Sequence, residues 1–308
     1  MDSTNRTYTG AGTPTLVTSL LISVVAFFVI IIGNALTLVA VWRTRRLQTI
    51  PNMYVTSLAV ADLLTGFLVV LNLLLTVEVS EDLYYNRSLC VAELIISLAL
   101  GGVSVTTMVT IAIDRYIYII HPLRYPTMTT PLRAKLIIAT TWIVSSCPNV
   151  FLVFHNDWDP SVGCSLPSTI PVEFVYRFTG GYFAMASVVT CLFYGAILRT
   201  AWRQNRRVAA DLKNSELTKS SWKLLKLFLV VFGVFFVCWF FVSLVFILGR
   251  FLTVPAWASY ISFRMLFVNS GANFFIYAWM NRDFRIAFKS ILCQSGNACC
   301  VLRETNTT

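Results

Sequence analysis

The chain has 308 residues, of which 57% are hydrophobic and only 12% are charged. A soluble globular protein carries about twice that charged fraction, so an ordinary soluble domain is excluded. The net charge of +10 does not indicate a nucleic-acid partner, because the basic residues lie beside apolar runs rather than in a polar domain. The composition therefore predicts a membrane protein with a basic cytoplasmic face.

Seven apolar runs are each long enough to cross a bilayer, which takes about 20 residues. The runs cover approximately 20–42, 53–77, 91–117, 134–154, 174–199, 224–248 and 257–279. The first run is too long for the apolar part of a signal peptide, so we expect it to remain as a spanning helix. The expected organisation is an extracellular N-terminus (1–19), a seven-helix membrane domain (20–279) and a cytoplasmic segment (280–308).

Charge sets the expected orientation. Most of the 24 Lys and Arg residues fall in 43–52, 115–135, 199–226 and the C-terminal segment, which the positive-inside rule places in the cytosol. On the opposite side, Asn5 and Asn86 each begin a glycosylation sequon. A third sequon at Asn306 would lie in the cytosol and is interpreted as a chance match.

The cysteine pattern argues against a zinc site or a thioredoxin-type redox motif, because the eight cysteines show no CxxC spacing and only two histidines are present. Cys90 and Cys164 are both expected at the outer surface, in the oxidising compartment, and are the natural disulfide pair.

The segment after Tyr277 is expected to form a short amphipathic helix along the inner membrane surface, in contact with lipid. Its apolar residues are Phe284, Ile286, Ala287, Phe288 and Ile291. Cys293, Cys299 and Cys300 follow, and juxtamembrane cysteines of this kind are either palmitoylated or free cytosolic thiols.

Six short strings are spread along these elements. They are GNALTLVAVW at 33–42, NMYVTSLAVADLLTG at 52–66, DRYIYIIHPLRY at 114–125, CWFF at 238–241, NFFIY at 273–277 and NRDFRIAF at 281–288. Together, in this order, they resemble the rhodopsin-like (class A) G-protein-coupled receptors, nearest in style to amine-type and adenosine-type receptors. The resemblance implies an all-α receptor of the plasma membrane, not an enzyme, that binds an extracellular small molecule or short peptide and activates heterotrimeric G proteins.

A charged pair, Asp114 and Arg115, lies at the inner end of the third span, where snorkelling and mutual pairing reduce the cost of burying charge. Arg115 could simply mark the membrane edge. The resemblance implies more, namely that Arg115 pairs with Asp114 at rest and is then released to the G protein. By the same resemblance, the coupling and switch residues are Asp114, Arg115, Tyr116, Leu123, Tyr194, Phe235, Trp239 and Tyr277. Ordinary core packing is the alternative for the aromatic ones.

Asp62 is the only acid deep within a span, where an unpaired carboxylate is costly. The resemblance implies an allosteric sodium ion, held by Asp62, Ser104, Asn269, Ser270 and Asn273, with Asn34 alongside. Oxygen donors of this kind suit a hard cation. A water-filled network around a protonated Asp62 is the alternative.

The sequence departs from the family at three places where proline is usual, which hold Ala186, Phe241 and Phe274. Because proline kinks a helix, we expect straighter helices or kinks of another origin. Ser221 stands where some relatives have an acid that pairs with the motif arginine, so we expect a weaker resting lock and higher basal signalling.

The ligand is less well defined. Ser97 stands where amine receptors carry an aspartate, Phe267 where opsins carry a lysine, and Phe246 where adenosine receptors carry an amide. The candidate pocket residues are Glu93, Ser97, Trp239, Phe246, Arg264 and Phe267. Glu93 and Arg264 could bind a zwitterionic or anionic ligand, or could pair with each other. A receptor-like protein without G-protein signalling, such as a scavenger or dimer partner, and a chemosensory receptor are the alternative functions.

Overall fold

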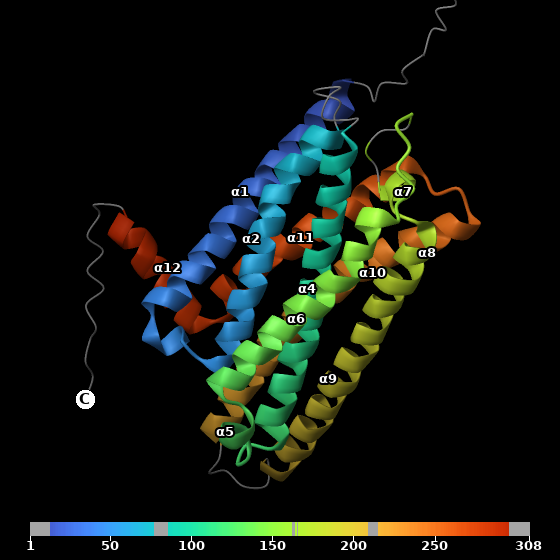
Figure 1. The fold of residues 1–308 in the computed structure, drawn as a ribbon. Helices are drawn as coiled ribbons and strands as arrows, with labels where there is room; N and C mark the ends of the chain where they lie inside the picture. The colour runs from blue at the N-terminus through green and yellow to red at the C-terminus, as the bar shows by residue number, and fades with distance from the viewer. Residues whose placement is uncertain (1–12, 77–85, 162–163, 165, 209–214, 296–308) are drawn as a thin grey trace, which may run out of the picture.

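The computed structural model describes residues 13–76, 86–161, 164, 166–208 and 215–295 (Figure 1). Within these ranges the chain is helical and contains no strand, which confirms the predicted all-α class. The long helices lie side by side as a bundle (Figure 1). They are α1 (Thr13–Arg43), α2 (Ile50–Thr76), α4 (Arg87–Ile120), α6 (Pro131–Phe154), α9 (Gly181–Val208), α10 (Ser215–Phe251) and α11 (Ala256–Met280).

Short elements connect the long helices. They are η1 (Arg45–Leu47), α5 (Tyr125–Met128), α7 (Leu166–Thr169), α8 (Val172–Phe174), the π-helical η2 (Val175–Gly180) and the C-terminal α12 (Arg282–Ser295). Most of the long helices extend past the predicted spans at one end or both; α10, for example, begins at Ser215 rather than near 224. The helix α9 begins later than predicted, at Gly181, because α8 and η2 form the first part of the fifth predicted span. The predictions counted apolar residues only, whereas a helix can continue past the membrane.

Six stretches in the described part of the chain are long and apolar enough to cross a membrane. They lie on α1, α2, α4, α6, the continuous α8–η2–α9 segment and α10. The seventh predicted span corresponds to α11, which packs against α1, α2 and α10 within the bundle. Its apolar character is diluted by Arg264 and by the buried polar residues Asn269, Ser270 and Asn273.

The three positions where the family usually has proline are occupied in different ways. Phe274 packs so closely on α1 that a Cβ on Gly33 would lie 2.8 Å from the Phe274 Cβ, which explains a glycine at this crossing. Ala186 is buried in the core of the bundle, and Phe241 is half-buried. The fifth span contains a π-helical turn, Val175–Gly180, outward of Ala186, which is an irregularity of another origin.

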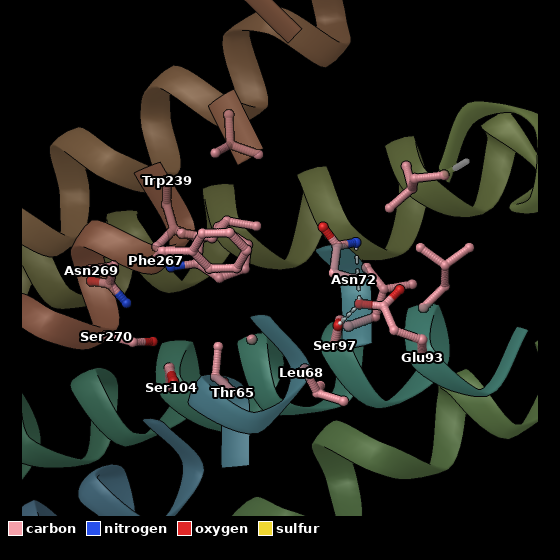
Figure 2. A pocket seen from close by; sticks show the side chains of 16 residues that line it. Thr65, Leu68, Asn72, Glu93, Ser97, Ser104, Trp239, Phe267, Asn269 and Ser270 are labelled. Atoms are coloured by element: carbon pink, nitrogen blue, oxygen red, sulfur yellow. Dashed lines mark hydrogen bonds between the residues drawn. The ribbon is translucent and has the colours of Figure 1, made fainter. Parts of the chain in front are cut away.

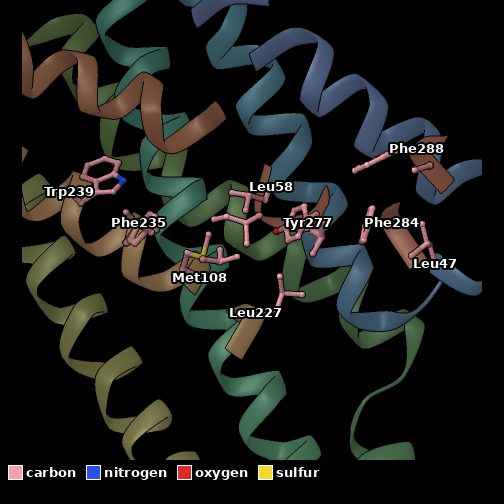
Figure 3. Packing of buried hydrophobic residues seen from close by; sticks show 14 of the residues in the cluster. Leu47, Leu58, Met108, Leu227, Phe235, Trp239, Tyr277, Phe284 and Phe288 are labelled. Atoms are coloured by element: carbon pink, nitrogen blue, oxygen red, sulfur yellow. The ribbon is translucent and has the colours of Figure 1, made fainter. Parts of the chain in front are cut away.

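The main hydrophobic core runs from the middle of the bundle to its inner end. It joins Leu58 of α2, Met108 of α4, Phe235 and Trp239 of α10, and Tyr277 of α11 (Figure 3). The same cluster includes three residues of α12, namely Phe284, Ala287 and Phe288. The predicted helix is therefore present as α12, but Phe284, Ala287 and Phe288 of its apolar side pack on the bundle, which the sequence did not predict, while Ile286 is exposed.

The predicted disulfide is also confirmed. Cys90, near the start of α4, is bonded to Cys164 in the outer loop, with a Cα–Cα distance of 5.6 Å. This bond ties the loop, and α7 that follows it, to the outer end of the bundle.

The docking of α12 generates a stability prediction. Phe284 is almost fully buried, and its ring lies 5.3 Å from that of Tyr277 and 5.7 Å from that of Phe288. Replacing a buried phenylalanine by alanine leaves a cavity and destabilises a protein by about 3 kcal/mol or more. We expect Phe284→Ala to lower the melting temperature of the purified protein, whereas Ile286→Ala, at an exposed position of the same helix, leaves it nearly unchanged. Equal effects of the two variants would contradict this docking.

Candidate functional site

The inner end of α4 carries the predicted buried ion pair. Asp114 and Arg115 are each only 4% exposed. Arg115 Nε donates a hydrogen bond to Asp114 Oδ2 at 3.0 Å, and Arg115 Nη2 donates to the same oxygen. The guanidinium also lies 5.2 Å from the centre of the Tyr118 ring. The pair is therefore held by hydrogen bonds and a cation–π contact, which is how a buried charge is tolerated.

A third residue completes this arrangement, and the sequence did not single it out. Tyr125 of α5 donates its hydroxyl proton to Asp114 Oδ1 at 3.0 Å. Burial, together with the negative charge of Asp114, raises the pKa of Tyr125, so the phenol stays protonated and remains a donor. Both carboxylate oxygens of Asp114 are thus occupied by groups of the chain itself.

The other predicted coupling residues surround this pair in different ways. Leu123, in the connection between α4 and α5, is 94% exposed and is open to a partner. Tyr116 packs edge-to-face on Phe193 of α9, with ring centres 5.1 Å apart. Tyr194 packs on Phe232 of α10, at 5.5 Å between ring centres.

Tyr277 lies in the last turn of α11, at the inner end of the bundle. Its ring stacks on Phe284, and its buried hydroxyl has no hydrogen-bond partner among the described residues. Tyr277, Arg115 and Tyr125 line one cavity at the inner end of the bundle, together with Leu227 and Asn281. Of the predicted coupling and switch residues, Arg115 and Tyr277 thus line one cavity at the face that the sequence places in the cytosol, whereas Trp239 lies on the wall of a different cavity.

A second cavity opens at the outer end of the bundle (Figure 2). It contains about 910 Å³ of space between atoms, a volume that includes the open solvent at its mouth. Four of the predicted pocket residues line it, namely Glu93, Ser97, Trp239 and Phe267. The sequence missed Asn72, which also lines it; the one available signal was an isolated amide within the apolar run of the second span.

The two charged residues expected near this pocket do not pair with each other. Glu93 Oε1 accepts hydrogen bonds from Ser97 Oγ at 3.0 Å and from Asn72 Nδ2 at 3.5 Å. Arg264 is not among the lining residues; its Nη1 donates to Ser23 Oγ of α1 at 2.7 Å, and its guanidinium lies 5.5 Å from the Phe267 ring centre. Phe246 lies in α10, but its side chain is not among those that the structure describes.

Trp239 forms part of the inner wall of the cavity. Its ring lies 5.9 Å from that of Phe183 and 6.0 Å from that of Phe235, which continues into the main core. A Cβ on Gly101 would lie 2.8 Å from Trp239 Cη2, so only glycine lets the indole cross α4 at this distance. Trp239 therefore connects the outer cavity directly to the aromatic core.

The inner part of the same cavity reaches the polar residues in the middle of the bundle. Ser104, Asn269 and Ser270 line the cavity, and Asp62 and Asn273 are buried beside them (Figure 2 labels the first three). Asn273 Nδ2 donates to Asp62 Oδ2 at 2.9 Å, whereas Asp62 Oδ1 has no hydrogen-bond partner among the described residues.

This central cluster fits a small hard cation. Its donors are a carboxylate, hydroxyls and amide oxygens, which are the ligands that such ions prefer. No cluster of three His, Cys, Asp or Glu suited to a transition metal occurs in the part of the chain that the structure describes. Asn34 has a structural role, since its Nδ2 donates to the main-chain oxygens of Ile30 at 2.9 Å and Ser270 at 3.1 Å, which joins α1 to α11.

Two predicted modification sites fall on described residues. Asn86 is the N-cap of α4, and its side-chain oxygen accepts a hydrogen bond from the Leu89 main-chain nitrogen at 3.0 Å. Cys293 is exposed on α12. Asn5, Cys299 and Cys300 lie outside the described residues.

A helical membrane bundle with a cavity at one end and a buried arginine at the other has the architecture of a transmembrane receptor. Residues 33–277 match the family model described as 7 transmembrane receptor (rhodopsin family). The chain therefore belongs to the rhodopsin-like seven-transmembrane receptors, the class A G-protein-coupled receptors, and is a multi-pass membrane protein with a seven-helix bundle.

The receptors that are similar in sequence to this chain are named for different ligands. The somatostatin receptor type 4 of Rattus norvegicus is 29% identical to this chain, over 96% of this chain and 77% of that receptor. The histamine H2 receptor of Cavia porcellus is also 29% identical, over 90% of this chain and 80% of that receptor. The human adenosine receptor A2a is 30% identical, over 85% of this chain and 69% of that receptor.

Proposed function

We propose that this receptor binds an extracellular small molecule or short peptide in the outer cavity and activates heterotrimeric G proteins at the inner end of the bundle. The observation that carries the proposal is the position of Arg115, which is buried against Asp114 on the wall of the inner cavity. The relatives named above for peptide, amine and nucleoside ligands support the same general activity.

The two ends of the bundle communicate through packed side chains. Trp239 lines the outer cavity and contacts Phe235, which shares a core cluster with Met108 and Tyr277. A ligand that repositions Trp239 would change the packing of α10 against α4 and α11. Such a ligand shifts the population toward a state in which the inner ends separate and Arg115 becomes available.

The proposed orientation places the inner cavity and α12 in the cytosol and the N-terminus outside the plasma membrane. The charge distribution of the sequence supports this orientation.

A glycan on Asn86 would be attached through Nδ2, which leaves the side-chain oxygen as the cap of α4. Palmitoylation of Cys293 would anchor α12 to the inner leaflet. The expectation about Ser221 remains a prediction, because its side chain is not described.

The coupling proposal is tested in cells that express sensors of G-protein dissociation, with each G-protein class present in turn. The receptor is measured without added ligand and with a panel of small molecules, and surface expression is matched. We expect Arg115→Ala to reduce the signal to that of empty vector. Lys289→Ala, which removes a positive charge on the exposed face of α12, is expected to leave the signal intact. An undiminished signal from Arg115→Ala would contradict the proposal, and a wild-type receptor that is silent in every class would favour the non-signalling alternative.

We further propose that the central cluster binds sodium through Asp62, Ser104, Asn269, Ser270 and Asn273. The partnerless, buried Oδ1 of Asp62 supports this assignment. The ion would neutralise the buried carboxylate and would favour the state in which these residues remain close together.

Sodium is therefore expected to stabilise the purified receptor. An ion at ten times its dissociation constant adds about 1.4 kcal/mol to the stability of the native state. The melting temperature should be higher in sodium chloride than in choline chloride at equal ionic strength. Asp62→Asn should abolish this difference, whereas Asp283→Asn, at an exposed acid of α12, should preserve it. An equal sodium effect in all three proteins would show that the ion acts elsewhere.

A further inference from the structure

Among the described residues that line the outer cavity, Glu93 is the one with a charged side chain. It is only 3% exposed and lies near the outer end of α4, close to the disulfide at Cys90. Figure 2 shows its carboxyl group beside Asn72 and Ser97, which both donate to Oε1. The other oxygen, Oε2, is buried and has no hydrogen-bond partner among the described residues.

This unmatched oxygen is not explained by the fold. A buried carboxylate requires a full set of hydrogen bonds or an opposite charge. The salt bridges among the described residues are Asp114 with Arg115 and Glu173 with Arg177, and neither involves Glu93. Arg264, the basic residue expected nearby, instead contacts Ser23 and Phe267. The described part of the chain therefore places a negative group in the cavity and no positive group beside it.

The hydrogen bond from Ser97 explains where this carboxylate is held. Ser97 and Glu93 are four residues apart on α4, so one turn of helix separates them on the same face. The Ser97 hydroxyl fixes Oε1 and leaves Oε2 for another donor. Amine receptors carry an aspartate at the position of Ser97, whereas in this chain the carboxylate lies one helical turn further out, on Glu93.

The other residues that line the cavity indicate the chemical character of the rest of the ligand. Trp239 and Phe267 supply aromatic surface deeper in the cavity, and Leu68, Leu94 and Leu98 supply aliphatic surface. A cavity with one negative group and mostly apolar walls favours a cation attached to an apolar or aromatic body. An anion would face the carboxylate of Glu93 and would be repelled.

We propose that Glu93 is the ligand-binding carboxylate of this receptor. Its ligand is a small organic monocation whose ammonium group binds Oε2 and whose apolar body lies against Phe267 and Trp239. This inference rests on the proposed receptor function and specifies its ligand class. It replaces the zwitterionic or anionic ligand that the sequence offered for Glu93 and Arg264 as the alternative to their pairing with each other.

The first experiment tests the carboxylate without a ligand and without signalling. Ser97→Cys places a thiol beside Glu93 in the purified receptor. The thiolate attacks the sulfenyl sulfur of a methanethiosulfonate, which forms a mixed disulfide and releases methanesulfinate. The cationic 2-(trimethylammonium)ethyl reagent is compared with the anionic 2-sulfonatoethyl reagent. Modification of residue 97 is followed by peptide mass spectrometry, and each rate is divided by the rate with a free thiol.

We expect the cationic reagent to react about tenfold faster than the anionic one, because opposite charges a few ångströms apart attract strongly in a buried site. Adding Glu93→Gln should reduce the ratio to about one, whereas adding Glu173→Gln, at an exposed acid, should not change it. Leu68→Cys gives a second labelling position on the cavity wall. A ratio that does not respond to Glu93→Gln, or a lack of labelling at both positions, would overturn the proposal.

The second experiment uses matched probes on the purified receptor. Phenethylamine and tryptamine are compared with the neutral alcohols 2-phenylethanol and tryptophol by the shift in melting temperature. We expect the amines to produce the larger shifts and Glu93→Gln to remove the difference. Alcohols that match the amines would overturn the proposal.

The two proposals fail in distinguishable ways. Amine binding that depends on Glu93, without G-protein activation by any ligand, would support this inference and contradict the proposed signalling. G-protein activation that depends on Arg115 but is unaffected by Glu93→Gln for every activating ligand would support the proposed signalling and contradict this inference.

Discussion

The buried ion pair between Asp114 and Arg115 is the interaction on which the resting arrangement of this receptor depends. A guanidinium and a carboxylate inside an apolar bundle are tolerated only when their hydrogen-bonding groups are matched. Here Arg115 occupies one carboxylate oxygen and Tyr125 the other, while Tyr118 lies against the guanidinium. These contacts all lie within α4 and the α5 that follows it. In the proposed activation, Arg115 would leave Asp114 when the inner ends of the helices separate, and the same guanidinium would then provide the binding group for the G protein.

Two further carboxylates are buried in the bundle, closer to its outer end than Asp114. Asp62, in the middle of the bundle, accepts a hydrogen bond on one oxygen from Asn273 of α11. Glu93, near the outer end, accepts hydrogen bonds on one oxygen from Asn72 of α2 and from Ser97 of its own helix. Each leaves its second oxygen without a partner among the described residues, in contrast to Asp114. The outer cavity is lined by Glu93 and, at its inner part, by Ser104, Asn269 and Ser270, beside which Asp62 is buried. The chain thus satisfies the inner carboxylate, and the two proposals assign a sodium ion to Asp62 and a cationic ligand to Glu93.

The sequence predicted the features that depend on local composition and not those that depend on tertiary contacts. Apolar runs and motif order predicted the bundle, the disulfide and the ion pair, because each follows from residues close in sequence or from topology. The contact of Tyr125 with Asp114 and the direction of Arg264 toward α1 depend on how helices pack. The seventh helix is a further example. The polar residues that lower the hydropathy of α11 also belong to the central cluster, and their role there depends on how the helices pack.

The most direct test of the resting lock is the basal signal of Tyr125→Phe, measured by G-protein dissociation at matched surface expression. This change removes only the hydrogen bond to Asp114. Because a bond to a charged acceptor contributes about 1.5 kcal/mol or more, the active population should rise by about tenfold. Tyr118→Phe, which keeps the ring beside Arg115, should leave the basal signal unchanged, and Arg115→Ala should abolish the rise. An unchanged basal signal in a well-expressed Tyr125→Phe receptor would contradict the account.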